Sequence, residues 1–188
     1  MSLDSLQPLR VLVVKEKMKK INPKVDGQNI KIFLREATER DILRLGVHHR
    51  KMFEEILEKK GERIDPSIGK AMERAYAKKL KKELPDGSCK AWVIEHKNRI
   101  VASGAITITS LVPTPKDLSS SVAYLHSMYT EKEFRNKNFA NLIVERAIRF
   151  CRDNGIKRAF LNASEAGRPI YEKLGFRAAP EMMRLVIE

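Results

Sequence analysis

Residues 122–155 read VAYLHSMYTEKEFRNKNFANLIVERAIRFCRDNG, and this stretch decides the fold. Alternating residues from Val122 to Thr130 predict a long strand. A helical pattern of apolar residues follows from Phe139 to Asn154, and Gly155 closes it as a C-cap. The order of strand, loop and helix predicts a β-loop-α unit within a mixed sheet.

The loop between that strand and that helix, Arg135 to Ala140, is basic. Backbone N–H groups at a helix N-terminus have no helical acceptor and carry partial positive charge. The loop is therefore suited to bind a diphosphate. Arg135 and Lys137 would add full positive charges beside such an anion.

Short apolar or alternating runs elsewhere predict the other strands of the sheet. The polar link from His96 to Arg99 joins two of these strands into an antiparallel pair. The expected strands, in chain order, are Ile30–Leu34, Trp92–Glu95, Ile100–Ile108, Val122–Thr130, Ala159–Leu161 and Met182–Ile187.

Cap and turn signals bound the helical parts of the chain. Thr38 is expected to cap the first helix, with Asp41 as its acidic partner three residues later. Pro85-Asp86-Gly87 predicts a turn after the early helices. Ser164 is expected to cap a later helix that ends at Gly175.

With these elements around it, the basic loop resembles the pyrophosphate loop of the GNAT superfamily of N-acetyltransferases. The family pattern is R/Q-x-x-G-x-G/A, and Arg135 and Ala140 match its first and last positions. Asn138 stands where the family usually has glycine. Because Asn is the non-glycine residue that most readily takes a positive φ, we expect a left-handed backbone at Asn138.

Three further stretches carry the resemblance, which covers about Ile30 to Ile187 in the same order and spacing. Arg35–Asp41 is similar to the family's opening strand-to-helix passage, Tyr124–Thr130 to its fourth strand, and Ile170–Phe176 to its late signature. The resemblance implies an α/β (α+β) fold: a mixed, mostly antiparallel, twisted sheet flanked by helices on both faces. It also implies acetyl transfer from acetyl-CoA, as co-substrate, to a primary amine by direct attack and without a metal.

The resemblance further implies which residues hold acetyl-CoA. In the family, main-chain groups of the fourth strand bind the pantetheine arm, and the basic loop binds the pyrophosphate. Polar side chains after the fifth strand often face the arm, and the tyrosine of the late signature lies near the sulfur. The implied residues are Met128, Tyr129, Thr130, Arg135, Asn136, Lys137, Asn138, Phe139, Ala140, Asn162 and Tyr171.

Two proton transfers need side chains of their own. Tyr171 is the expected general acid, because a departing thiolate gains from a nearby proton and a phenol keeps its proton at neutral pH. The alternative is that Tyr171 only packs or binds the cofactor. His126 is the expected base, with a pKa suited to the task, while Glu95 and water stay open as rivals. His48 and His49 are neighbours on a helix, so we expect surface histidines there.

Period-two alternation divides the side chains of the long strand between two faces. The face that carries His126 would hold the base. The expected faces are Tyr124, His126 and Met128 on one side, and Leu125, Ser127 and Tyr129 on the other.

The composition fits a soluble globular protein of one domain, with 43% hydrophobic and 32% charged residues. No run reaches the length of a membrane span, so no membrane partner is expected. Cys89 and Cys151 form no CxxC pair, so we expect no disulfide or zinc site, and a cytoplasmic protein. Residues 1–29 are expected to be an extension that is partly disordered or vector-derived, and residues 30–188 the acetyltransferase domain.

Two other function classes stay open. Asn138 leaves room for a GNAT-like module that holds an acyl-CoA without turnover. The net charge of +13 leaves room for a nucleic-acid-associated protein, although the basic residues are spread along the chain and disfavour that alternative. The acceptor amine is not indicated, and a homodimer is also open.

Overall fold

The computed structural model describes residues 19–21, 24–25, 28–29 and 31–187. Its strands are β1 (Lys19–Ile21), β2 (Lys24–Val25), β3 (Gln28–Asn29), β4 (Ile32–Glu36), β5 (Cys89–His96), β6 (Arg99–Ser110), β7 (Ser121–Thr130) and β8 (Arg158–Leu161). Its helices are α1 (Ile42–Glu58), α2 (Pro66–Asp86), α3 (Phe139–Asp153) and α4 (Arg168–Lys173), with 3-10 turns at Glu39–Asp41 and Lys132–Phe134.

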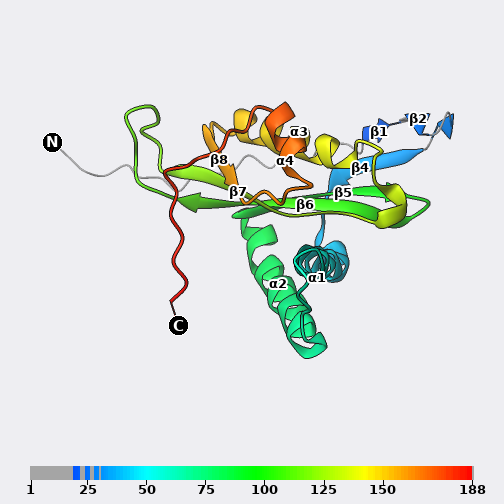
Figure 1. Ribbon diagram of the computed structural model, residues 1–188. Coiled ribbons are helices and arrows are strands. Elements are labelled where there is room, and N and C mark those ends of the chain that lie inside the picture. Colours follow the sequence, from blue (N-terminus) through cyan, green and yellow to red (C-terminus); the bar gives the residue numbers. More distant parts are fainter. Residues whose placement is uncertain (1–18, 22–23, 26–27, 30, 188) are drawn as a thin grey trace.

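Six strands form one sheet in the order β1-β4-β5-β6-β7-β8. Neighbours are antiparallel except β7 and β8, which are parallel because α3 carries the chain back between them. Helices α1 and α2 cover one face of the sheet, and α3 and α4 cover the other (Figure 1). This confirms the fold expected from the sequence, a mixed and mostly antiparallel sheet with helices on both faces.

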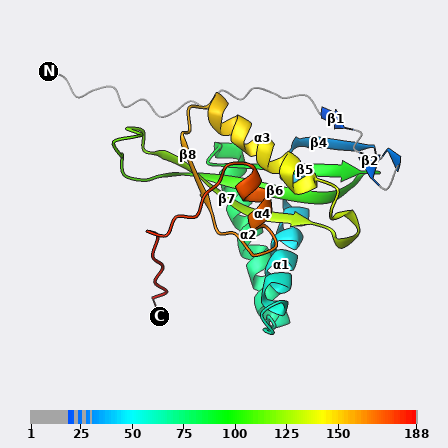
Figure 2. The same cartoon turned by 45° about the horizontal axis from the view of Figure 1, so that its top comes forward.

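Each face of the sheet has its own hydrophobic core, because alternate strand residues point to opposite sides. On the α3 face, Ile94, Ile106 and Leu125 pack against the α3 residues Ile143 and Val144. Figure 2 shows α3 lying obliquely across the strands on this side. The other core joins α1 and α2 to the sheet through Leu45, Tyr76, Leu80, Val93 and Ala105.

The predicted caps and turns hold with two differences. The Asp41 carboxylate accepts a hydrogen bond from the Thr38 backbone N–H at 2.7 Å, as expected of a capping pair. The α2 helix continues through Pro85 and Asp86, and only Gly87 (φ 78°) lies beyond it, as its left-handed C-cap. Ser164 accepts from the Gly167 N–H at 3.2 Å, so it closes the turn before α4 rather than capping the helix directly.

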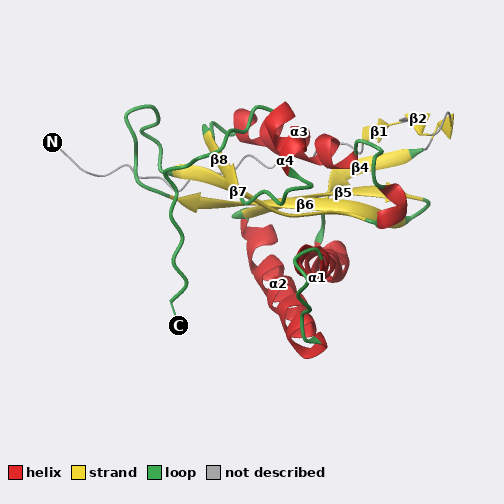
Figure 3. Cartoon of the chain, in the orientation of Figure 1, coloured by secondary structure: helices red, strands yellow, loops and turns green. Residues whose placement is uncertain are grey.

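The two ends of the described chain differ from expectation. Strand β1, from the segment expected to be an extension, pairs with β4 and widens the sheet. The apolar run Arg10–Val14, which could also form a strand by its sequence, lies outside the described residues. The strand expected at Met182–Ile187 is wrong, because those residues form a loop that runs off the body (Figure 3). Its side chains are exposed, Met183 by 97% and Ile187 by 86%, so the apolar run has no sheet partner within the described chain.

Candidate functional site

The candidate site lies where β7 and β8 separate. Their parallel pairing ends at Leu125 and Leu161, while β7 continues to Thr130. Within the described residues, the β8-facing edge of that last part of β7 pairs with no strand. An extended ligand arm can hydrogen-bond to such an edge as an added strand would. The expected pantetheine contacts, Met128 to Thr130, all lie on this stretch.

A β-bulge reorders the side chains of β7 at this point. The partner of Tyr129 is Ser103, but the partner of His126 is Ala105, and Ser127 takes a positive φ of 55°. The expected alternation is therefore wrong after His126. Ser127 and Tyr129 turn to the α1 side, where they hydrogen-bond to α1, and Met128 turns to the α3 core.

Met128 fits on the α3 side because residue 104 is a glycine. A Cβ atom on Gly104 would lie 2.1 Å from Met128 Sδ and 2.9 Å from Ile143 Cγ2, both too close. Only glycine allows the bulged strand to approach β6 in this way.

The basic loop takes the backbone conformation expected of it. Asn138 has φ 64° and ψ 12°, which confirms the left-handed conformation, and Asn136 also has a positive φ, of 60°. Leu142 donates to the Asn138 carbonyl at 3.2 Å at the start of α3. The N–H groups of residues 139–141 precede it and have no helical acceptor, so they can bind an anion. Phe139 is 2% exposed, and its side chain packs in the α3 core.

The side chain of Arg135 contacts α1. Its Nη2 lies 2.6 Å from Glu55 Oε2, and its Nε donates to the Thr130 carbonyl at 3.0 Å. Tyr129 donates its hydroxyl proton to the other Glu55 oxygen at 3.0 Å. The charge of Arg135 is thus paired with the carboxylate of Glu55 in this structure.

His126 belongs to a polar group that joins the sheet to the helices. Its Nε2 lies 2.9 Å from Thr107 Oγ1, and its Nδ1 lies 3.0 Å from Ser127 Oγ and 3.4 Å from the Tyr76 hydroxyl. His49 Nδ1 lies 2.8 Å from the same Ser127 oxygen. We call these five residues the histidine group.

Burial changes the acid–base properties of these histidines. Desolvation lowers the pKa of His126 to about 3, helped by the charge of Lys79, and lowers the pKa of His49 to about 4. Both rings are therefore neutral at physiological pH, and the expected ordinary pKa of His126 needs correction.

His48 is wholly buried, so the expectation of a surface histidine is wrong at this position, whereas the neighbouring His49 is partly exposed. Its Nδ1 lies 2.8 Å from Ser103 Oγ, and its Nε2 lies 3.5 Å from the buried carboxylate of Glu131. That carboxylate also pairs with Arg44 at 2.5 Å and Lys51 at 3.1 Å. Desolvation lowers the pKa of His48 to about 3. These contacts tie α1 to β6 and to the end of β7.

Tyr171 lies on the other face of the sheet, half-buried on α4. Its ring packs at the edge of the α3 core and lies 5.9 Å from the ring of Phe176. Burial raises the pKa of Tyr171 to about 12, so the hydroxyl stays protonated at neutral pH. Asn162, beyond the end of β8, donates from Nδ2 to the Tyr124 hydroxyl at 3.0 Å.

Glu95 is not brought to the histidine group. Its carboxylate lies 2.5 Å from Arg35 Nε. Strand register places it beside Ile100, whereas His126 is aligned with Ala105, which pairs with Ala91. That offset of four residues and two strands is roughly 15 Å of backbone. The structure therefore separates the two residues that the sequence offered as rival bases.

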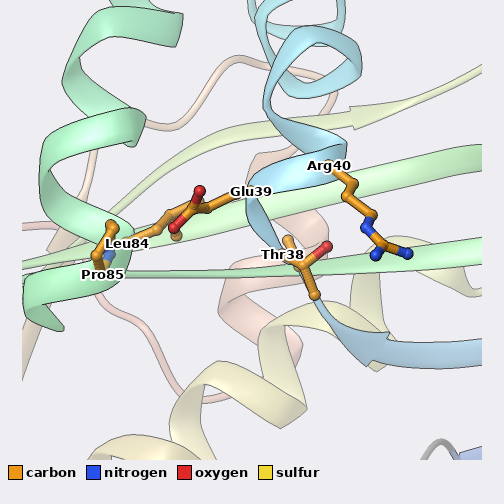
Figure 4. A pocket seen from close by; sticks show the side chains of 6 residues that line it. Thr38, Glu39, Arg40, Leu84 and Pro85 are labelled. Atoms are coloured by element: carbon orange, nitrogen blue, oxygen red, sulfur yellow. The ribbon is translucent and has the colours of Figure 1, made fainter.

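Two hollows in the surface lie apart from these contacts. One of about 600 Å³ opens between the start of α1 and the end of α2, and its lining includes Thr38, Arg40 and Pro85 (Figure 4). The other, of about 230 Å³, lies between α3 and the β7–β8 pair and is lined by Leu125 and Phe176 among others. Neither is lined by the expected site residues.

Sequence reasoning missed His49, Tyr76, Thr107, Ser127 and Glu55 as members of this region. They lie on α1, α2, β6 and β7, and only the folded sheet brings them together. The described residues contain no group of three or more His, Cys, Asp or Glu placed to hold a metal ion. No helix among them is both long and apolar enough to cross a membrane.

Comparisons with known proteins agree with this geometry. The family model described as "Acetyltransferase (GNAT) domain" matches residues 57–184, more than half of the chain. A glucosamine 6-phosphate N-acetyltransferase from Trypanosoma brucei brucei is 29% identical over 87 residues, which cover 46% of this chain and 57% of that protein. The chain thus matches little more than half the length of this curated relative.

Solved structures extend the likeness over most of the fold. A "predicted acetyltransferase with acetyl-CoA" from Clostridium acetobutylicum has a TM-score of 0.71 and 26% identity, covering 82% of this chain and 96% of that one. A GCN5-related N-acetyltransferase from Ralstonia eutropha JMP134 has a TM-score of 0.73 and 24% identity, covering 82% and 98%. The second likeness supports the fold alone.

Proposed function

This chain belongs to the GNAT acetyltransferase family, and we propose that it transfers an acetyl group from acetyl-CoA to a primary amine. The observation that carries the proposal is the left-handed Asn138 at the start of α3, beside the unpaired edge of β7. Together they offer backbone donors for a diphosphate and an open strand edge for a pantetheine arm. The solved relative with acetyl-CoA supports the same cofactor.

In this proposal the chain holds acetyl-CoA mainly through its backbone. The N–H groups of residues 139–141 and the loop before them, including Asn136 and Lys137, face the pyrophosphate. Main-chain groups of residues 128–130 face the pantetheine arm, and Asn162 faces it from the end of β8. Arg135 acts indirectly, by fixing the loop against Glu55.

The chemistry is a direct attack by the amine nitrogen on the thioester carbon. The new bond joins nitrogen to that carbon, and the bond from carbon to sulfur breaks. We assign Tyr171 as the acid that protonates the departing thiolate, because its raised pKa keeps the hydroxyl proton in place. Burial raises the pKa of Cys89 to about 12 and of Cys151 to about 11, so neither thiol suits a covalent intermediate.

The base is assigned to the histidine group that contains His126. Two observations favour this group over Glu95: the Glu95 carboxylate is bound to Arg35, and it lies far along the sheet. Neutral imidazoles can accept a proton, whereas an ion-paired carboxylate has its charge already engaged.

The acceptor is proposed to be a small amine that carries an anionic group, with amino sugar phosphates first. The name of the Trypanosoma relative motivates this order, and the net charge of +13 would attract both such acceptors and acetyl-CoA. A cytoplasmic location is also proposed, which the free and buried state of both cysteines favours. A homodimer is proposed as well, because the exposed apolar residues 182–187 would gain from cover.

The proposal is tested by two measurements on the unmodified protein. Calorimetry should detect acetyl-CoA binding, and free-thiol release should be seen with at least one amine of a small panel. The panel holds glucosamine 6-phosphate, kanamycin, spermidine and an alanine-terminated peptide. Absence of binding would remove the cofactor assignment. Binding without turnover on any amine would favour a module that only holds acyl-CoA.

A further inference from the structure

His49 ends a chain of hydrogen bonds that crosses from α1 to β6 through the bulge of β7. The chain runs from His49 Nδ1 to Ser127 Oγ (2.8 Å) and from Ser127 Oγ to His126 Nδ1 (3.0 Å). It continues from His126 Nε2 to Thr107 Oγ1 (2.9 Å). The His49 ring also stacks on the Tyr76 ring, with centroids 4.1 Å apart, so its orientation is fixed from two sides.

The two histidines differ in which nitrogens are engaged. Both ring nitrogens of His126 lie within hydrogen-bond distance of a hydroxyl oxygen. Within the described chain, the Nε2 atom of His49 has no hydrogen-bond partner, and it is not among the buried polar atoms without one. That atom is therefore open to a new hydrogen-bond partner, whereas both ring nitrogens of His126 are already engaged.

We propose that His49 is the catalytic base, and that its Nε2 takes the proton from the acceptor ammonium. The inference rests on the proposed acetyl transfer and names the residue that performs its first step. His126 is then a positioning residue, which holds His49 through Ser127. Nothing in the residue pattern of the sequence singles out His49 for this role.

The proposed role requires one of the two self-consistent sets of hydrogen-bond directions along this chain. In that set His49 donates its Nδ1–H to Ser127, Ser127 donates its hydroxyl proton to His126 Nδ1, and His126 donates its Nε2–H to Thr107. This arrangement leaves the lone pair of His49 Nε2 free to accept. Any other tautomer of His49 would put a proton on the accessible nitrogen and remove its capacity as a base.

The protons balance over one turnover. The acceptor ammonium gives one proton to His49 Nε2 and becomes a neutral amine, whose nitrogen attacks the thioester carbon. As that bond forms, the carbon–sulfur bond breaks, and the sulfur leaves with the electron pair. The nitrogen's second proton replaces the proton that Tyr171 gives to the thiolate, and the imidazolium of His49 releases its own to solvent. The nitrogen becomes more acidic as it bonds to carbon, which favours the loss of this second proton.

The test compares matched variants with two kinds of nucleophile. His49→Asn keeps a polar atom near the Nδ1 position and lacks Nε2, and His49→Gln places an amide near Nε2 that cannot take up a proton. His96→Gln is a control at the end of β5. Each protein is assayed for free-thiol release with the best amine of the panel, and with hydroxylamine, whose nitrogen is already unprotonated at neutral pH. Acetyl-CoA affinity is measured separately by calorimetry.

With the panel amine, we expect both His49 variants to lose about 10²–10⁴-fold in kcat, the usual contribution of a positioned base. With hydroxylamine they should stay near the parent rate, with acetyl-CoA affinity unchanged, and His96→Gln should match the parent throughout. His126→Gln should lose less than either His49 variant. Equal losses with both nucleophiles would make His49 structural, and a parent rate in His49→Gln would exclude it as the base. If the parent binds acetyl-CoA but acetylates no amine of the panel, the proposed function fails first, and the role of His49 fails with it.

Discussion

Arg135 and Glu55 lie 80 positions apart in the chain, yet Arg135 Nη2 is 2.6 Å from Glu55 Oε2. Glu55 also accepts the hydroxyl proton of Tyr129, which lies on the bulged part of β7. One carboxylate on α1 therefore contacts both Arg135, the first residue of the basic loop, and Tyr129 on the strand beside it. The basic loop is therefore held against α1.

This contact predicts that Arg135 and Glu55 act as a unit. Arg135→Gln and Glu55→Gln should each weaken acetyl-CoA binding. The double variant should bind acetyl-CoA only slightly more weakly than the single variant with the larger loss. The expected coupling energy is about 0.5–3 kcal/mol, the range for contacting residues. Calorimetric dissociation constants for the four proteins measure it.

The control is the exposed pair Arg99–Glu133, with a similar contact of 2.6 Å but both side chains 54% exposed. Surface ion pairs of this kind contribute little, so changing either residue of this pair, or both, should leave acetyl-CoA affinity unchanged. Additive effects of Arg135 and Glu55 would show that the contact does not position the loop.

Asn138 gives a second prediction, because its φ of 64° lies in the left-handed region. Asn138→Gly should keep the loop and bind acetyl-CoA at least as tightly as the parent, since glycine takes this conformation without strain. Asn138→Val should weaken binding and lower the melting temperature, because a β-branched residue resists a positive φ. Equal affinity and stability in all three proteins would contradict the strained-turn account.

The buried histidines predict a loss of stability in mild acid. The folded-state pKa values are about 3 for His48 and His126 and about 4 for His49, against about 6.5 in an unfolded chain. Below pH 6.5 the unfolded state binds more protons than the folded one, so the free energy of unfolding falls as the pH falls. The slope should reach at most about 1.4 kcal/mol per pH unit for each histidine.

Urea denaturation between pH 4.5 and pH 8 measures this slope. The window separates the histidines from Asp41, whose pKa is lowered from 3.8 and whose contribution is lost only at still lower pH. His48→Gln and His126→Gln should each make the profile shallower. A flat profile down to pH 4.5 would show that these rings are not buried in neutral form.

Tyr171 gives a prediction about the chemical step. Tyr171→Phe keeps the ring that packs at the α3 core and removes only the hydroxyl, so folding and acetyl-CoA binding should survive. Turnover should fall by about 10²–10⁴-fold if that hydroxyl protonates the thiolate. Tyr124→Phe, which removes a hydroxyl bound to Asn162, should lose less. Parent-rate turnover in Tyr171→Phe, with acetyl transfer rate-limiting, would leave Tyr171 as a packing residue.

The parts of this molecule that follow local rules were predictable from the sequence. The β7 strand, the α3 helix and the left-handed Asn138 depend on nearby residues, and all three agree with expectation. The capping contact of Thr38 with Asp41 is equally local. Such features depend on periodicity and backbone preference, which a single chain displays directly.

The features that the sequence did not predict depend on contacts between segments that are distant in the chain. Ser127 carries no bulge signal of its own, and Gly104 explains the bulge only once β6 is placed beside β7. The burial of His48 and the contacts of the partly exposed His49 depend on which face of α1 meets the sheet. Residues 182–187 show the converse case, because an apolar run alone does not make a strand without a neighbouring edge to pair with.

The measurement that tests the central claim most directly is mass spectrometry of a quenched single turnover. The protein is mixed with less than one equivalent of acetyl-CoA and an excess of the best panel amine. The masses of the protein and of the amine are then measured in the same quenched sample. Direct attack predicts an acetylated amine in proportion to the free thiol released, with the protein mass unchanged at every time point. An acetyl group carried on the protein, or thiol release without acetylated amine, would contradict it.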